Sequence, residues 1–194
     1  MGLCPFKQRL EKLSLHFRDS KHERRKGLTM RSKAIEESTL SVILKAMQKE
    51  NRLALEVSLY TGLRISDVLS IKTQNLHKAS FVVYEQKTGK RKKIVLPARL
   101  KNELFQICGH VYVFQGRLNG NKPRTRQAVW KDLHRVAGLF RLKGGCSPHS
   151  MRKTYAVDLR KMGLTPARIQ KALNHTDLCV TALYMYADEL QMRQ

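Results

Sequence analysis

Acidic residues are scarce in this chain, whose 194 residues include 15 aspartates and glutamates against 38 lysines and arginines. The formal net charge at pH 7 is therefore +23. So large an excess of positive charge favours a polyanionic partner, and nucleic acid is the first candidate. Charge alone leaves two alternatives open: a basic surface that serves only solubility, and an RNA-binding protein of the ribosomal kind.

Cysteines and long apolar runs are also in short supply. The four cysteines contain no Cys-x-x-Cys pair and form no dense disulfide framework, which favours a reducing compartment. No apolar run approaches the ~20 residues that span a membrane, and the N-terminus has no apolar signal-peptide core. These absences argue against a secreted or membrane protein and predict a cytoplasmic one, or a nuclear one if the source is a eukaryote.

The first 33 residues are expected to stand apart from the rest. Apolar residues recur at helical spacing between Phe6 and Phe17, which predicts one amphipathic helix. The basic stretch that follows, with Arg24 and Arg25, is typical of a linker or of a strap along a DNA backbone. A solvated tail with a docking helix explains it equally well.

Residues 34–194 predict one mixed α/β domain that is mainly helical. Apolar periodicity predicts helices over 36–48, 51–61, 63–71 and 98–107, with Asn51 as the N-cap of the second. Arg64 then falls at a junction between helices, near Asp67, whose carboxylate could hold its guanidinium group in place.

A small antiparallel sheet is expected in the middle of the domain. Residues 81–84 and 93–96 have strand character, and the basic turn 87–90 between them predicts a hairpin. An exposed basic loop follows at 116–124. Thr125 then opens a helix that is expected to turn four apolar side chains inward: Val129, Trp130, Leu133 and Val136.

The last quarter of the chain carries the polar residues best suited to chemistry. Ser147-Pro148 reads as an N-cap followed by a first-turn proline, which places His149 and Arg152 on one face of a helix. Thr165-Pro166 predicts a second helix, ending near Asn174-His175. A third helix is expected to start at Thr176-Asp177 and to carry Tyr184. Each helix end lies beside a polar residue that could hold a phosphate.

Taken in chain order, these segments resemble the catalytic domain of the tyrosine recombinase (phage integrase) family. The matching segments are 59–67 with Arg64, 87–97 with Lys87, 147–152 with His149 and Arg152, 173–175 with His175, and Tyr184. Two positions depart from the family pattern: Asn174 stands where glycine is common, and Lys153 where histidine is common.

The resemblance implies a site-specific DNA recombinase that integrates, excises or inverts DNA through a 3′-phosphotyrosine intermediate, without a nucleotide cofactor or a metal. Arg64 and Arg152 would bind the scissile phosphate, since a guanidinium donates bidentate hydrogen bonds and stays protonated. His149 would take or relay the proton of the Tyr184 hydroxyl, and His175 would donate to a phosphate oxygen. Lys87 would protonate the departing 5′-oxygen.

Two of these assignments need a choice between neighbours. Lys87 is preferred to Lys90 because it precedes the Thr-Gly turn, where the family places its lysine. Tyr184 is preferred to Tyr186 because it lies nine positions after His175, the separation that the family uses. Tyr155, on the helix of His149, is expected to pack.

The expected partner is double-stranded DNA, bound by a homotetramer on paired sites with accessory DNA-bending proteins. The expected location is the cytoplasm, in association with the nucleoid, for a protein encoded by a bacterium or a phage. Candidate DNA contacts beyond the catalytic set are Lys90, Arg91, Lys92, Lys122, Arg124, Arg126, Arg24 and Arg25. Because residues 1–33 are short for the helical DNA-binding domain that usually comes first, the chain resembles either a compact fimbrial-type inverter or an integrase without that domain.

Three other functions are weighed against a recombinase. Cys146-x-x-His149 and His175-x-x-x-Cys179 resemble halves of a zinc site, although the sequence shows no obvious carboxylate that would hydrogen-bond to the histidine ligands. A non-catalytic DNA-binding regulator would not need the full set of six polar residues. A topoisomerase of the same mechanistic type is poorly separated from a recombinase by sequence.

Overall fold

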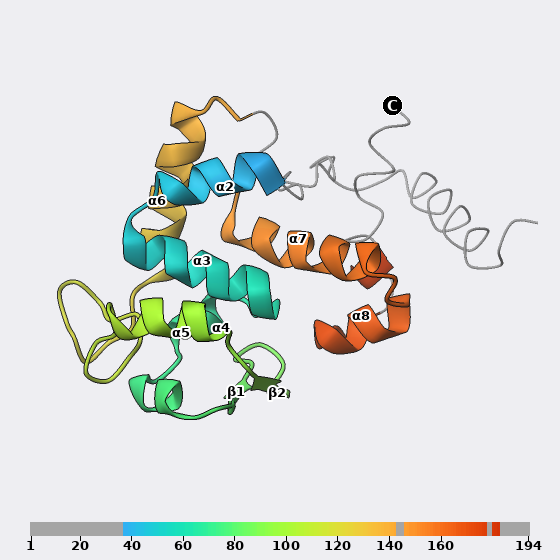
Figure 1. Cartoon of the computed structure of the whole chain (residues 1–194), viewed down its shortest axis with the longest axis horizontal. Helices are drawn as coiled ribbons and strands as arrows, with labels where there is room; N and C mark the ends of the chain where they lie inside the picture. Colours follow the sequence, from blue (N-terminus) through green and yellow to red (C-terminus); the bar gives the residue numbers. More distant parts are fainter. Residues whose placement is uncertain (1–36, 143–145, 178–179, 183–194) are drawn as a thin grey trace, which may run out of the picture. The chain divides into compact units, whose positions relative to one another are not determined.

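The computed structural model describes residues 37–142, 146–177 and 180–182 (Figure 1). Its elements, in chain order, are α2 (Glu37–Lys45), α3 (Lys49–Thr61), α4 (Ile65–Leu69), the 3₁₀ helix η1 (Thr73–His77), β1 (Phe81–Tyr84), β2 (Arg91–Ile94), α5 (Ala98–Phe105), α6 (Arg126–Leu139), α7 (Pro148–Lys161) and α8 (Pro166–Ala172). The predicted fold class, mainly α with a small antiparallel sheet, is confirmed. None of the described helices is long and apolar enough to cross a membrane.

Helix α3 is the central element, with α7 on one side and α5 on the other (Figure 1). Leu53, Leu55 and Val57 are completely buried although they point in different directions around the helix, as expected for a helix enclosed on several sides. The helix ends at Gly62, whose φ of 67° lies in the left-handed region. A Cβ on Gly62 would lie 2.4 Å from the ring of Tyr155, so only glycine lets α7 approach this helix end.

The N-terminus of α3 differs from the prediction. The helix begins at Lys49, and Gln48 rather than Asn51 is the N-cap residue. Asp132, from α6, accepts hydrogen bonds from the Gln48 backbone N–H at 3.0 Å and from Asn51 Nδ2 at 2.8 Å. Arg124 donates through Nε to Asn51 Oδ1 at 2.6 Å. A distant carboxylate therefore does the work that a local cap was expected to do.

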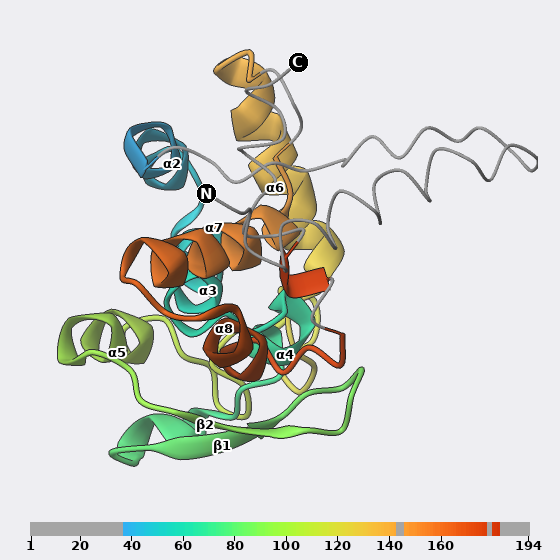
Figure 2. The same cartoon turned by 90° about the vertical axis from the view of Figure 1, so that its right-hand side faces the viewer.

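The predicted hairpin is present, with a shifted second strand. Strand β1 pairs with β2 so that Phe81 faces Ile94 and Tyr84 faces Arg91. The Glu85 backbone N–H donates to Lys90 O at 2.9 Å, which closes a six-residue turn immediately before β2. Because pairing starts at Arg91 and β1 is only four residues long, the ladder ends at Ile94 and not at residue 96. Figures 1 and 2 both place this hairpin below α8.

Helix α6 confirms three of its four predicted core residues. Val129, Leu133 and Val136 are fully buried, but Trp130 remains 45% exposed. At 3.6 residues per turn, the three buried positions define one stripe, and Trp130 falls about 100° away from Val129. Its indole stacks on the His134 ring, with centroids 4.8 Å apart. The prediction that Trp130 is a core residue is therefore wrong.

Candidate active site

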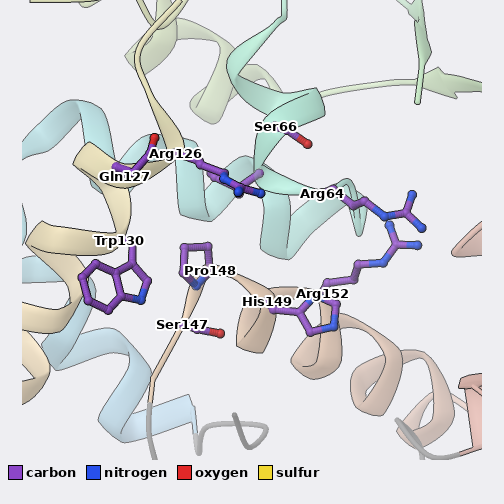
Figure 3. A pocket seen from close by; sticks show the side chains of 10 residues that line it. Arg64, Ser66, Arg126, Gln127, Trp130, Ser147, Pro148, His149 and Arg152 are labelled. Atoms are coloured by element: carbon purple, nitrogen blue, oxygen red, sulfur yellow. The ribbon is translucent and has the colours of Figure 1, made fainter. Parts of the chain in front are cut away.

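A cavity of about 460 Å³ opens between the start of α4, the start of α6 and the start of α7 (Figure 3). Its walls are basic and aromatic, and the lining residues are Arg64, Ile65, Ser66, Arg126, Gln127, Trp130, Ser147, Pro148, His149 and Arg152. Three of them are arginines and none is acidic. A concave site with this charge suits an anionic ligand such as a phosphate.

The start of α7 presents His149 and Arg152 as the sequence predicted. Ser147 is the N-cap residue, Pro148 occupies the first turn, and the Ser147 backbone N–H donates to Ser150 Oγ at 3.3 Å. Both Ser150 and Met151 are completely buried, which fixes the rotation of the helix. His149 and Arg152, three residues apart, therefore line the same cavity.

Arg152 is held in one orientation before any ligand binds. Only 1% of its surface is exposed. Nη1 donates to the carbonyl of Gly62 at 2.5 Å, and Nη2 donates to the carbonyl of Leu173. These carbonyls follow the ends of α3 and α8, so one guanidinium group joins two helix ends. A donor fixed in this way loses little freedom when it binds a phosphate oxygen.

Arg64 lies just before α4 and is paired with a carboxylate that the sequence did not reveal. Its Nη1 donates to Oε2 of Glu85, whose side chain is completely buried. Asp67, the expected partner, instead accepts the Gln86 backbone N–H at 3.0 Å. Burial raises the pKa of Asp67. The carboxylate that contacts Arg64 thus comes from the hairpin and not from the next turn of the same helix.

Both candidate histidines are neutral near pH 7. His149 faces the open cavity, yet partial loss of surrounding water and the charges of Lys153 and Arg152 lower its pKa to about 4. Burial and the charges of Arg152 and Arg64 lower the pKa of His175 to about 4 as well. A neutral imidazole can accept a proton, which is what activation of a hydroxyl nucleophile requires. His175 Nδ1 also lies 3.0 Å from Thr181 Oγ1.

The hairpin lysines point in different directions. Lys87 and Lys90 are exposed on the turn, and the charge of Lys87 contributes to the lowered pKa of His149. Lys92 lies on the inner face, because it pairs with the buried Val83 whereas Arg91 pairs with the exposed Tyr84. This differs from the expectation that Lys92 belongs to a run of phosphate-contacting residues.

The amine of Lys92 is bound between the same helix ends that Arg152 joins. Nζ donates to the carbonyl of Thr61 and to that of Ala172, and it lies 5.5 Å from the centre of the Tyr155 ring. Burial, and then the charge of Arg152, lower its pKa to about 8. Lys92 thus joins the ends of α3 and α8 next to Arg152.

The remaining predicted residues fall into three groups. Arg126 lines the cavity and Lys122 is exposed on its loop. Arg124 is half-buried and bonded to Asn51, so its side chain supports α3. Arg24, Arg25, Tyr184 and Tyr186 lie outside the described residues, as does the whole segment 1–33, and so does most of the helix expected after Thr176, of which residues 180–182 are helical.

Sequence reasoning missed Glu85, and it expected Lys92 to contact DNA where the structure has it bonded to the ends of α3 and α8. The hairpin register was the signal that could have revealed Lys92, because strand alternation places it opposite Val83. Nothing local could have revealed Glu85.

Only one of the two cysteines considered for a zinc site lies within the described residues. Cys146 is buried, and burial raises the pKa of its thiol to about 11, whereas Cys179 lies outside the described residues. Among residues 37–142, 146–177 and 180–182, no group of three His, Cys, Asp or Glu side chains is arranged to hold a metal ion.

The sequence profile of the phage integrase family matches residues 33–191. A tyrosine recombinase XerD of Halalkalibacterium halodurans is 24% identical over 155 residues, which cover 74% of this chain and 51% of the relative. A tyrosine recombinase of Thermosipho africanus is 28% identical over 160 residues, which cover 77% of this chain and 56% of the relative. The chain spans about half the length of these curated relatives.

Solved structures with the same fold include a lambda integrase dimer bound to a COC′ core site, with a TM-score of 0.67 and 19% identity over 93% of this chain and 68% of that one. The XerH site-specific recombinase bound to its palindromic difH substrate after cleavage has a TM-score of 0.65 and 17% identity, covering 82% of this chain and 51% of that one. These likenesses agree with the mainly helical architecture. With a family profile that matches most of its length, the chain belongs to the phage integrase family.

Proposed function

We propose that this chain is the catalytic part of a site-specific DNA recombinase that cuts and rejoins strands through a 3′-phosphotyrosine intermediate. The observation that carries the proposal is the pair Arg64 and Arg152. The two arginines come from separate elements, line one cavity with His149, and are each bound to protein acceptors that fix their guanidinium groups. A scissile phosphate gains negative charge on its non-bridging oxygens in the transition state, and two fixed guanidinium groups would stabilise that charge.

The proposed step exchanges one phosphodiester for another. The hydroxyl oxygen of Tyr184 attacks the phosphorus, the O–P bond forms, and the bond from phosphorus to the 5′-oxygen breaks. His149, neutral at pH 7, takes or relays the tyrosine proton. Lys87 gives a proton to the departing 5′-oxygen, and His175 hydrogen-bonds to a phosphate oxygen. Because no water is consumed, the covalent intermediate can be attacked by another 5′-hydroxyl to restore the strand.

Double-stranded DNA is the proposed substrate. The related structures named above were solved bound to their DNA sites. In this chain Arg126 lines the cavity, and Lys90, Arg91 and Lys122 are exposed basic residues that could contact a DNA backbone. We include in the proposal a homotetramer on paired sites, assisted by DNA-bending proteins, acting on the nucleoid. Lys92 and Arg124 are left out of the contact set because their side chains bond to other parts of the fold.

Covalent trapping tests this function. A nicked suicide duplex that carries candidate sites from the DNA flanking the gene should yield a protein–DNA adduct on a denaturing gel, also in the presence of EDTA. Tyr184→Phe should bind the duplex and give no adduct, whereas Tyr186→Phe, the matched control, should still give one. An adduct that maps to Tyr186, or one that forms only when magnesium is restored, contradicts the mechanism. Relaxation of plasmids that carry no such site would favour a topoisomerase.

The role of Lys87 has its own test. A substrate whose 5′-oxygen is replaced by sulfur has a leaving group that needs no proton. This substrate should restore cleavage by Lys87→Ala to near the wild-type rate. Rescue of Lys90→Ala in its place would reverse the assignment.

A further inference from the structure

Glu85 is a buried carboxylate in a hairpin whose turn is otherwise basic and exposed. It follows β1 directly, and its backbone opens the turn that carries Lys87. Its side chain is completely buried. Moving a carboxylate out of water is costly unless its oxygens are paired and hydrogen-bonded. Both oxygens of the Glu85 carboxylate are therefore expected to accept hydrogen bonds.

Both oxygens of this carboxylate are engaged, and their three donors come from three parts of the chain. Oε2 accepts hydrogen bonds from Arg64 Nη1 and from Thr88 Oγ1, the latter at 3.1 Å. Oε1 accepts from Asn174 Nδ2 at 3.1 Å. Arg64 is a proposed phosphate ligand, Thr88 follows Lys87, and Asn174 precedes His175. One proposed catalytic residue, Arg64, is therefore bonded to Glu85 directly. Two others, Lys87 and His175, are sequence neighbours of residues that are bonded to it.

The bond to Asn174 completes a row of side-chain bonds along the turn after α8. Lys92 binds the carbonyl of Ala172, Arg152 binds that of Leu173, and Glu85 binds the side chain of Asn174. Asn174 has a φ of 52°, a left-handed conformation that asparagine adopts more readily than most residues. The direction in which the chain leaves this turn sets the position of His175.

The ion pair with Glu85 leaves Arg64 capable of binding a phosphate. A guanidinium group has five N–H donors, and the carboxylate occupies one of its terminal nitrogens. The pair restrains the rotation of a long side chain that is otherwise 22% exposed at the cavity edge. Restraint of this kind places a donor before the substrate arrives.

We infer that Glu85 is a positioning residue for strand cleavage, which sets the Arg64 guanidinium, the Lys87 turn and the His175 segment relative to one another. This inference rests on the proposed function and adds a residue to it. The opposite arrangement, in which the carboxylate competes with the phosphate for Arg64, predicts that removing its charge speeds cleavage.

Single-turnover cleavage of the suicide duplex separates these two roles. Glu85→Gln keeps the shape of the side chain and removes its charge. The rate of adduct formation should fall about 10- to 100-fold, the range found when the partner behind a metal-binding side chain is lost. The affinity for DNA should stay equal or increase, because a negative charge has been removed. A variant that was merely less folded would lose binding and cleavage together.

Glu103→Gln is the matched control. Glu103 is also an ion-paired carboxylate, bound to Arg52 and Arg99, but it lies on α5 away from the cavity. The Glu103→Gln variant should cleave at the wild-type rate. The double variant Arg64→Ala with Glu85→Gln should be slowed by less than the product of the two single effects, because part of the effect of Glu85 passes through Arg64 and residues in contact are not additive. Wild-type or faster cleavage by Glu85→Gln, or full additivity in the double variant, overturns the inference.

Hydrogen exchange tests the same arrangement without any cleavage. In the unliganded chain, Glu85→Gln should speed amide exchange in the peptides that cover 85–90 and 172–176, while Glu103→Gln should leave both unchanged. If the wild type forms no adduct, the proposed function fails, and this measurement alone decides whether Glu85 holds the two segments. Unchanged exchange in either peptide contradicts the inference.

Discussion

The folded environment of Lys92 predicts that the contribution of this residue to stability grows as the solution becomes moderately alkaline. Burial and the nearby charge of Arg152 lower its pKa from 10.5 to about 8 in the folded state. Below pH 8 the amine is charged in both states, so its contribution to stability is constant. Between pH 8 and 10.5 the unfolded chain binds more protons than the folded chain, and the free energy of unfolding therefore rises with pH.

The size of the effect follows from the change in pKa. A fall from 10.5 to about 8 corresponds to roughly 3 kcal/mol at ~1.36 kcal/mol per pKa unit. About 2 kcal/mol of it should be gained between roughly pH 7.5 and 9.5, and screening of the partly exposed amine reduces this figure. Cys146 acts in the opposite sense, since burial raises its pKa from 9.0 to about 11. The contribution of Lys92 must therefore be measured as a difference between variants.

Urea unfolding at a series of pH values measures that difference. Lys92→Met keeps most of the length of the side chain and cannot titrate, whereas Lys93→Met removes an exposed lysine from the same strand. The stability of the wild type relative to Lys92→Met should increase by about 2 kcal/mol from pH 7.5 to 9.5. The wild type and Lys93→Met should follow parallel curves. Parallel curves for the wild type and Lys92→Met would refute the reasoning.

Three further predictions concern the site and its substrate. Arg152→Ala should slow adduct formation by roughly 10²- to 10³-fold, the cost of one oxyanion donor, measured at a temperature where the variant remains folded; a loss below tenfold contradicts its role. DNA affinity should fall about 10³- to 10⁵-fold between ~50 and ~200 mM salt if 6–10 phosphates are contacted, and a nearly flat salt dependence in a binding titration contradicts DNA binding. The ring protons of His149 and His175 should shift in NMR spectra of the free protein only near pH 4, where each imidazole gains its proton; titration between pH 6 and 7 would show that neither site lowers the pKa.

Local signals predicted the helices that carry the site. Ser147-Pro148 and Thr165-Pro166 begin α7 and α8 as expected, because an N-cap and a first-turn proline act within a few residues. The helix was expected to end near Asn174, and α8 ends at Ala172, with Asn174 in the left-handed region two residues later. These segments carry the candidate site residues. The expected roles of those residues came from the family resemblance, and membership of that family is now confirmed.

Features that depend on distant partners could not be predicted in this way. Glu85 meets Asn174 across 89 residues of sequence, and Asp132 replaces the expected Asn51 cap across 81 residues or more. Trp130 was expected to face inward together with Val129, Leu133 and Val136, but the helix buries only the stripe of the other three. Each of these errors arises where tertiary packing, and not the local pattern, decides the outcome.

The bond from Arg152 to the carbonyl of Leu173 has a consequence for incomplete chains. The acceptor lies 21 residues after the arginine, and the turn that contains it is also held by Lys92 and Glu85. A polypeptide that stops during translation before Leu173 keeps most of its positive charge and the Gly62 carbonyl, but it lacks the second carbonyl that orients Arg152. In such a product the guanidinium group of Arg152 is bound on one side only, so Arg152 becomes fully oriented only once the turn after α8 has been made.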